Sequence, residues 1–134
     1  MLYPMFAMVI LTFLVAINLF RLRYTAIKSG SVRLSQFRLN TGEMPDKIIQ
    51  AANNYANLFE VPMLFYVACA TAIALGIQTP LMIIVAWVFV VARIIHSLIH
   101  LTSNNVIFRL YAYVLGIICV LILWVLLIAS FATR

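Results

Sequence analysis

The sequence has few charged residues and very few acidic ones. Only 9% of its 134 residues are Asp, Glu, Lys or Arg, and just three of these are acidic. Soluble domains carry roughly 25% charged residues, so this chain lacks the polar surface that keeps a monomer in water. Because 66% of the residues are hydrophobic and the mean hydropathy is +1.14, intrinsic disorder is excluded as well. The composition predicts a small integral membrane protein with a single domain.

Glycine and cysteine are also scarce. The four glycines form no GxxxG motif, so the sequence offers no glycine-based contact between membrane helices that would predict an oligomer. Cys69 and Cys119 lie in apolar stretches without a CxxC motif. This favours buried thiols that pack as small hydrophobic groups over a disulfide or a redox pair.

Four apolar stretches are long enough to cross a bilayer, which takes about 20 residues. The first contains no charge and is followed by Arg21 and Arg23, whereas a secretory signal has its charge in front. We therefore interpret it as a retained membrane helix. Pro45 is a typical first-turn residue for the second span, which is expected to end at Gly76. The sequence predicts an all-α bundle with helices over about residues 2–20, 45–75, 80–101 and 106–132, and a loop over 21–44.

Most basic residues lie in and beside that one loop. Six of the nine lysines and arginines are found there: Arg21, Arg23, Lys28, Arg33, Arg38 and Lys47. Basic residues that flank membrane spans set topology and favour the cytoplasmic side. We therefore expect loops 21–44 and 102–105 in the cytoplasm and both termini outside. The same explanation makes a nucleic-acid partner unnecessary.

Polar residues recur at helical spacing inside three of the spans. In the second span they are Asp46, Gln50, Asn53, Asn57 and Glu60, which are spaced by 4, 3, 4 and 3 residues. The third span carries Arg93, His96, Ser97 and His100, and the fourth carries Asn105, Arg109, Tyr113 and Gly116. Such spacing places each set on one helical face. Because polar groups are costly at membrane depth, the three faces are expected to form a polar pocket near the cytoplasmic side.

The charges in the expected pocket do not balance. Glu60 is the one acid in an apolar stretch, so it can neutralise only one of Arg93 and Arg109. An unpaired buried guanidinium is costly, and arginine suits planar anions such as carboxylates. The pocket is therefore expected to recruit an anionic ligand, and one side could admit a lipophilic molecule from the bilayer.

Simpler interpretations stay open for each of these residues. The row of Asn53, Asn57 and Glu60 could hold helices together, and Arg93 and Arg109 could extend to the membrane interface. His96 and His100 have the spacing of metal ligands, but no third ligand is placed near them by the sequence. No metal site is therefore expected.

The polar residues also form a pattern that resembles a known family. In chain order, it consists of Asn57, Glu60 and Pro62, then Arg93 and His96, then Arg109 and Tyr113. This pattern resembles the MAPEG superfamily, the membrane-associated proteins in eicosanoid and glutathione metabolism. The resemblance covers nearly the whole chain, including the four spans and the basic first loop, and suggests a divergent member of bacterial type in the inner membrane.

The resemblance implies a homotrimer that binds glutathione between neighbouring subunits near the cytoplasmic face. Asn57 and Glu60 would hold the peptide part of glutathione, and Arg93 would contact one of its carboxylates. Arg109 would be the catalytic residue, because a cation beside the sulfur favours the thiolate that attacks a lipophilic electrophile. The complete set of expected glutathione-binding residues is Asn53, Asn57, Glu60, Arg93, His96, His100 and Tyr113.

Three positions depart from the pattern of the superfamily. Asn53 stands where members that use glutathione usually have arginine, which removes one carboxylate contact. His100 stands where eicosanoid branches often have tyrosine, and Leu110 stands where one synthase branch has serine. Nothing in the sequence selects an eicosanoid substrate.

Three functions fit these residues. The first is a glutathione- or thiol-dependent transferase or peroxidase that acts on lipophilic electrophiles. The second is a non-catalytic membrane scaffold or accessory subunit, and the third is a lipid- or anion-binding protein with the same pocket. A transporter is disfavoured, because the four expected spans show no break in a helix.

Overall fold

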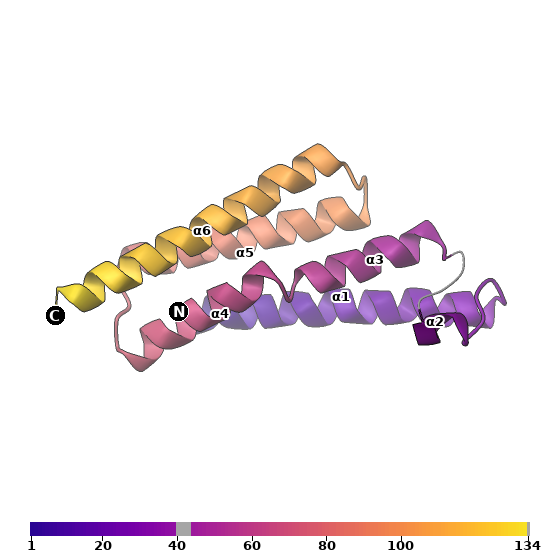
Figure 1. The fold of residues 1–134 in the computed structure, drawn as a ribbon, viewed down its shortest axis with the longest axis horizontal. Helices are drawn as coiled ribbons and strands as arrows, with labels where there is room; N and C mark the ends of the chain where they lie inside the picture. Colours follow the sequence, from indigo (N-terminus) through magenta and orange to yellow (C-terminus); the bar gives the residue numbers. More distant parts are fainter. Residues whose placement is uncertain (40–43, 134) are drawn as a thin grey trace.

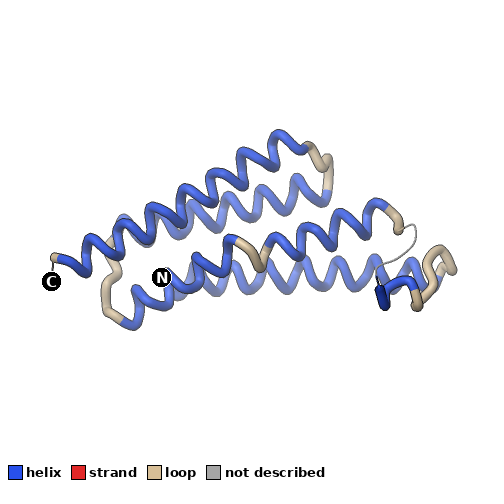
Figure 2. The backbone as a smooth tube through the Cα atoms, viewed as in Figure 1, coloured by secondary structure: helices blue, strands red, loops and turns tan. Residues whose placement is uncertain are grey.

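The computed structural model describes residues 1–39 and 44–133, apart from the side chains of residues 38 and 39. This part of the chain is helical and contains no strand (Figures 1 and 2). Its elements are α1 (Leu2–Lys28), α2 (Gln36–Leu39), α3 (Asp46–Asn57), α4 (Val61–Ala74), α5 (Pro80–Leu101) and α6 (Val106–Ala132). Four segments are long and apolar enough to cross a membrane, namely α1, α3 with α4, α5 and α6. The predicted all-α membrane bundle is thus confirmed.

Helix α1 is longer than the sequence suggested. It was expected to end near Phe20, but it continues for two more turns to Lys28. Charge ends an apolar span without ending a helix, and residues 21–28 contain neither glycine nor proline. The first residue that turns the chain is Gly30, whose φ is +73°. The predicted loop over 21–44 therefore begins eight residues too early.

The second span is broken in its middle, where a single helix over 45–75 was expected. Helix α3 ends at Asn57, and α4 begins at Val61. Pro62 explains the break, because proline has no N–H to donate to the carbonyl four residues earlier and its ring clashes with that turn. Glu60, the residue just before α4, has a non-helical φ of −85° and ψ of −100°. The second span is thus a broken helix, so unbroken spans no longer speak against a transporter.

One capping side chain lies at the start of each of the last two spans, a threonine for α5 and an asparagine for α6. Thr79 accepts a hydrogen bond from the N–H of Met82, 3.3 Å away, at the start of α5. Asn105 accepts from the N–H groups of Ile107 and Phe108, at 3.0 and 3.3 Å, at the start of α6. These three bonds satisfy donors that a helix leaves free in its first turn.

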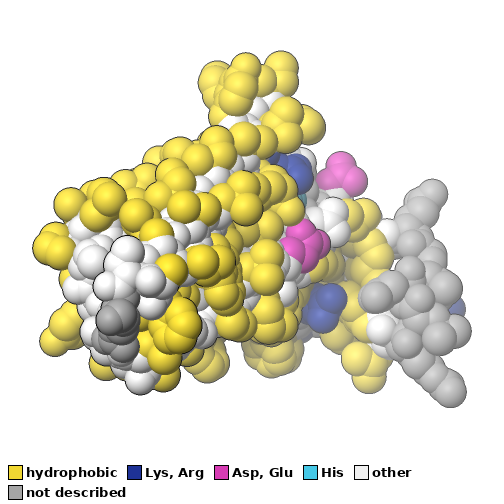
Figure 3. All heavy atoms as spheres, turned by 60° about the vertical axis from the view of Figure 1, so that its left-hand side comes forward, with side chains coloured by type: hydrophobic (Ala, Val, Ile, Leu, Met, Phe, Trp, Pro, Cys, Tyr) yellow, Lys and Arg dark blue, Asp and Glu magenta, His cyan; other side chains and the backbone are white. Residues whose placement is uncertain are grey.

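The spans run side by side along the length of the molecule (Figure 1). Helices α5 and α6 form one pair, α1 packs along α3 and α4, and α5 also contacts α1 and α3. Aromatic packing in the core centres on Phe65 and Phe89, which are fully buried and stack with ring centroids 4.3 Å apart. The outer surface is mainly hydrophobic, as a surface that faces lipid must be (Figure 3).

Candidate functional site

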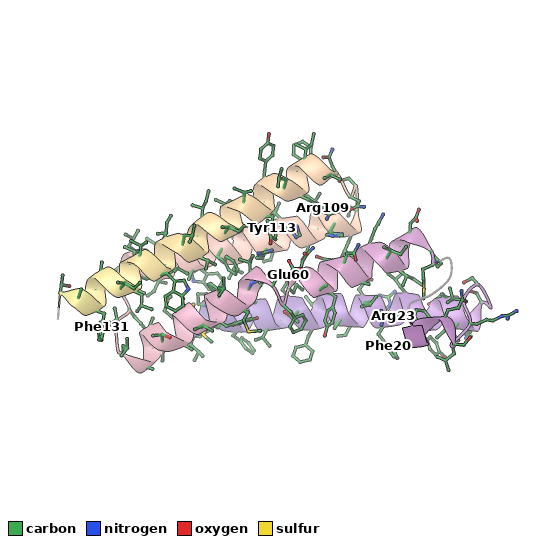
Figure 4. All side chains as sticks on the ribbon, in the orientation of Figure 1. Phe20, Arg23, Glu60, Arg109, Tyr113 and Phe131 are labelled. Atoms are coloured by element: carbon green, nitrogen blue, oxygen red, sulfur yellow. The ribbon has the colours of Figure 1, made fainter. Side chains whose placement is uncertain are left out.

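A cavity of about 250 Å³ opens at the break between α3 and α4 and faces the first turns of α6. Asn57 is the last residue of α3, and Glu60 directly precedes α4, so the break brings both to the cavity. Figure 4 shows Glu60 at this break, with Tyr113 and Arg109 on the helix across from it. The full lining consists of Asn57, Glu60, His96, Val106, Arg109, Leu110 and Tyr113. We call this the Glu60 cavity.

The polar face of α6 forms the opposite wall. Arg109 and Tyr113 are four residues apart and therefore lie one above the other on the helix. His96 reaches the cavity from α5, and its ring centroid lies 6.0 Å from that of Tyr113. The structure thus brings together five of the residues expected at the site, from three different spans.

Arg93 lies behind this wall and has no exposed surface. Its Cζ is 5.0 Å from the ring centroid of Tyr113 and 5.4 Å from that of Phe89. Within the described residues, none of its three side-chain nitrogens has a hydrogen-bond partner. Cation–π contacts contribute about 2 kcal/mol or more each when desolvated, but they do not neutralise the charge, so a positive charge without a counter-ion among the described residues stays next to the cavity.

A glycine makes room for that guanidinium. A Cβ atom at Gly116 would lie 3.3 Å from Nε of Arg93 and 3.6 Å from its Cζ. This is closer than most side-chain contacts allow, so Gly116 permits the approach of Arg93 to α6. The expected polar face of α6 therefore includes Gly116 for a steric reason.

Arg109 is held from the connection between α5 and α6. Its Nη1 donates a hydrogen bond of 2.7 Å to Oδ1 of Asn104, whose φ of 49° is unusual for a residue other than glycine. Its Nε is buried without a partner among the residues described. Glu60 is exposed and forms no ion pair with Arg93 or Arg109 in the described part of the chain. The expected neutralisation of one arginine by Glu60 is thus not seen.

A sequence model of the MAPEG family matches residues 1–129 of the 134-residue chain. The chain belongs to the MAPEG family. This family is generally associated with glutathione and includes glutathione transferases and related proteins. No curated protein and no solved structure gives a significant match to the chain.

Besides Arg93, which lies behind the cavity wall, two residues expected at the site lie outside the Glu60 cavity of this MAPEG protein. His100 is buried one turn beyond His96, with ring centroids 5.7 Å apart, and neither of its nitrogens has a partner in the described structure. Asn53 is exposed and lines a different cavity, together with Arg23. The spacing of 4, 3, 4 and 3 residues places these side chains on one face only if the helix is continuous. Because the helix is broken at residues 58–60, Glu60 and Asn53 no longer lie on one helical face.

The polar pattern of the second span does not include Asn54, although Asn54 is the buried polar residue of α3. Asn54 has no exposed surface, and its Oδ1 accepts a hydrogen bond of 3.1 Å from Oγ of Ser97 on α5. A second pattern in the sequence could have revealed it, because Ile48, Ala51, Asn54 and Leu58 are spaced by 3, 3 and 4 residues and are all buried. The bond joins two spans beside the cavity.

We expect Ser97→Ala to weaken this join by about 1 kcal/mol, because hydrogen bonds between membrane helices contribute about 0.6–2 kcal/mol. Unfolding by SDS in mixed micelles, followed by circular dichroism, measures the loss. Thr102→Ala is the matched control, since the Thr102 hydroxyl donates only to Leu98 of its own helix. Equal losses in the two variants would contradict a stabilising contact between α3 and α5.

No metal site is formed by the described residues, which contain no group of three His, Cys, Asp or Glu side chains placed to hold an ion. His96 and His100 lie near each other, but they lack a third ligand. The Glu60 cavity itself is lined by amide, carboxylate, guanidinium, imidazole and phenol groups.

Proposed function

We propose that this MAPEG protein binds glutathione at the Glu60 cavity and joins it, through its sulfur, to lipophilic electrophiles. One observation carries the proposal, namely the fully buried Arg93 guanidinium without a counter-ion in the described structure. Such a group costs several kcal/mol when unpaired. An anionic ligand would remove that cost, and glutathione has two carboxylates and an ionisable thiol.

The residues around the cavity suggest a role for each part of the ligand. Glu60 is an exposed acid at the break and suits the ammonium group of glutathione, while the Asn57 amide suits its peptide groups. A carboxylate would pair with Arg93 once the Tyr113 ring turns aside, because that ring contacts the guanidinium and also lines the cavity. His96, from α5, would add a further polar contact.

Arg109 would act on the sulfur. A cation beside a thiol favours the thiolate, which is the nucleophile. The thiol proton leaves to solvent, and an electron pair of the sulfur then forms a bond to the electrophilic carbon. The leaving group of the acceptor departs with its bonding pair. Val106 and Leu110 give the cavity an exposed apolar rim, through which an acceptor dissolved in the bilayer can enter.

We propose further that the site is completed by neighbouring subunits of a homotrimer. The cavity of a single chain, about 250 Å³, is smaller than the roughly 300–1,000 Å³ of pockets that enclose small ligands. Its side also opens to the surface of α6 rather than into the bundle. A second copy placed there would close the cavity around a tripeptide.

We also propose a cellular placement. The basic residues at the ends of α1 and α3 favour the cytoplasm for that end of the bundle, with both termini outside, and the resemblance to a bacterial-type member suggests a bacterial inner membrane. The scaffold alternative receives support only from Asn54 and Ser97, because Asn53, Asn57 and Glu60 make no side-chain hydrogen bond to another span in the part described. A non-catalytic anion-binding protein fits Arg93 equally well and differs from a transferase in turnover.

Calorimetry of the detergent-solubilised protein tests the proposal. Glutathione should bind at millimolar concentration or below, and Arg109→Gln should weaken it at least tenfold, because the variant loses the charge beside the sulfur. Lys47→Gln, which alters an exposed charge away from the cavity, is the control. Conjugation of glutathione to chlorodinitrobenzene separates an enzyme from a binding protein. No binding at millimolar glutathione would refute the assignment.

A further inference from the structure

A second cavity, of about 270 Å³, lies where the end of α1 meets the start of α3. It shares no lining residue with the Glu60 cavity. Phe37 of α2 covers one side, and Ile48, Ile49 and Ala52 of α3 form an apolar wall. Arg23 and Asn53 supply its polar side chains. We call this the Arg23 cavity; Figure 4 labels Arg23 near the end of α1.

The Arg23 guanidinium is positioned to bind an anion. Its Cζ lies 5.4 Å from the ring centroid of Phe37, which holds the side chain against the cavity. Its Nε is buried and has no hydrogen-bond partner among the residues described. Arginine presents several donors in one plane, and the amide of Asn53 on the same cavity can add another. The cavity therefore combines a fixed cation with an uncharged donor, and no acidic side chain is found among the described residues that line it.

The depth of Arg23 identifies where that anion would come from. Arg23 is 21 residues beyond Leu2, the first residue of α1, which corresponds to roughly 30 Å along a helix that rises 1.5 Å per residue. The hydrocarbon core of a bilayer is also about 30 Å thick. The Arg23 cavity thus lies at the level of the lipid phosphates, if α1 begins at the opposite surface.

The surroundings of the cavity favour a lipid over a free ion. Exposed basic residues lie around it at the same end of the bundle, namely Arg21, Lys28, Arg33 and Lys47. Ile49 continues the apolar wall to the outer surface, where it is 45% exposed. A hydrated phosphate gains nothing from such a wall, whereas an acyl chain can pack on it. Clustered basic residues at a membrane surface also attract anionic lipids, by about 1 kcal/mol each.

We propose that the Arg23 cavity binds the phosphodiester of an anionic phospholipid. The Arg23 guanidinium pairs with the phosphate oxygens, the Asn53 amide donates to the headgroup, and an acyl chain lies along Ile49. The site is independent of the proposed glutathione site, because no side chain lines both cavities. Its loss should leave glutathione binding unchanged.

Native mass spectrometry of the full-length protein in detergent, titrated with phosphatidylglycerol, tests this site. We expect one tightly held lipid per chain, and at least tenfold weaker binding in Arg23→Gln. Arg21→Gln is the matched control, since it removes the same charge two residues away from an exposed side chain that does not line the cavity. Its affinity should fall by no more than about fivefold, which corresponds to the ~1 kcal/mol that one surface charge contributes. Equal losses in Arg21→Gln and Arg23→Gln would show diffuse attraction and overturn the proposal.

A competition experiment distinguishes the source of the phosphate, and a second variant keeps the test valid if the first one misfolds. Glycerophosphoglycerol and inorganic phosphate, at the same concentrations, should compete at least tenfold less well than the lipid; equal competition would assign the cavity to a soluble phosphate and overturn the lipid site. Should Arg23→Gln fail to fold, Asn53→Leu provides the second variant, because Asn53 is exposed and its replacement leaves the bundle intact. It should weaken phosphatidylglycerol several-fold, and an unchanged affinity would also count against the proposal.

Discussion

Arg93→Met is expected to stabilise the ligand-free protein and at the same time to abolish its stabilisation by glutathione. Methionine is unbranched and adaptable, so it can fill the space of the arginine stem without carrying a buried charge. Replacing a buried charge by a well-packed apolar side chain often stabilises a protein by about 1–4 kcal/mol. Arg93 is the largest fully buried side chain, and its three nitrogens lack partners in the described structure. We therefore expect a gain toward the upper part of that range.

The two effects are separated by thermal unfolding with and without glutathione. In the unchanged protein, a ligand at ten times its Kd adds about 1.4 kcal/mol of stability. Arg93→Met should unfold several degrees higher without glutathione and should show no further increase with it. Lys47→Met, which replaces an exposed lysine, should alter neither quantity. A lower unfolding temperature together with a preserved glutathione response would show that Arg93 is a structural residue only.

If Arg93 costs folding stability but binds glutathione, several features around it are explained. Gly116 lacks the side chain that would push against Nε of Arg93, although glycine costs a helix about 1 kcal/mol relative to alanine. Tyr113 presents its ring to the guanidinium and also lines the Glu60 cavity. Gly116 lowers helix stability, and Tyr113 gives Arg93 a ring face in place of a counter-ion; such costs are common where a protein prepares a ligand site.

The sequence predicted the composition of the site better than its geometry. The heptad-like spacing of Arg93, His96 and His100 places them on one face, and all three are buried in α5. The charge count also anticipated an arginine without a counter-ion. These features follow from local periodicity and from the cost of charge in lipid, both of which can be evaluated without coordinates.

The remaining features depend on contacts between distant residues. Whether Asn53 or Asn54 is buried depends on where α5 places Ser97, which is 43 positions away from Asn54. The end of α1 depends on Gly30 rather than on the first charges after the apolar stretch. Pro62 stands within the second span and is compatible with a break before α4. Membrane helices tolerate proline in other cases, so proline alone does not predict the break.

Phe89→Ala is expected to destabilise the bundle by about 2 kcal/mol and to weaken ligand binding as well. In soluble proteins, Phe→Ala in a core costs about 3–5 kcal/mol, from lost transfer to an apolar medium and from the cavity left behind. In a bilayer the transfer contribution largely disappears, because lipid tails are as apolar as the core. The cavity and the lost stacking on Phe65, 4.3 Å between ring centroids, account for the remaining cost.

The effect on binding arises because Phe89 also supports the guanidinium of Arg93, at 5.4 Å from its ring centroid. Without the ring, the Arg93 side chain can occupy the vacated space and turn away from Tyr113. SDS unfolding measures the stability, and calorimetry of glutathione at a temperature where the variant stays folded measures the binding. Phe6→Ala is the control, since Phe6 is 60% exposed on the lipid side of α1 and its removal leaves no cavity. A loss of stability with full glutathione affinity would mean that the aromatic stack supports the fold alone, and that Tyr113 and Gly116 suffice to hold Arg93 in place.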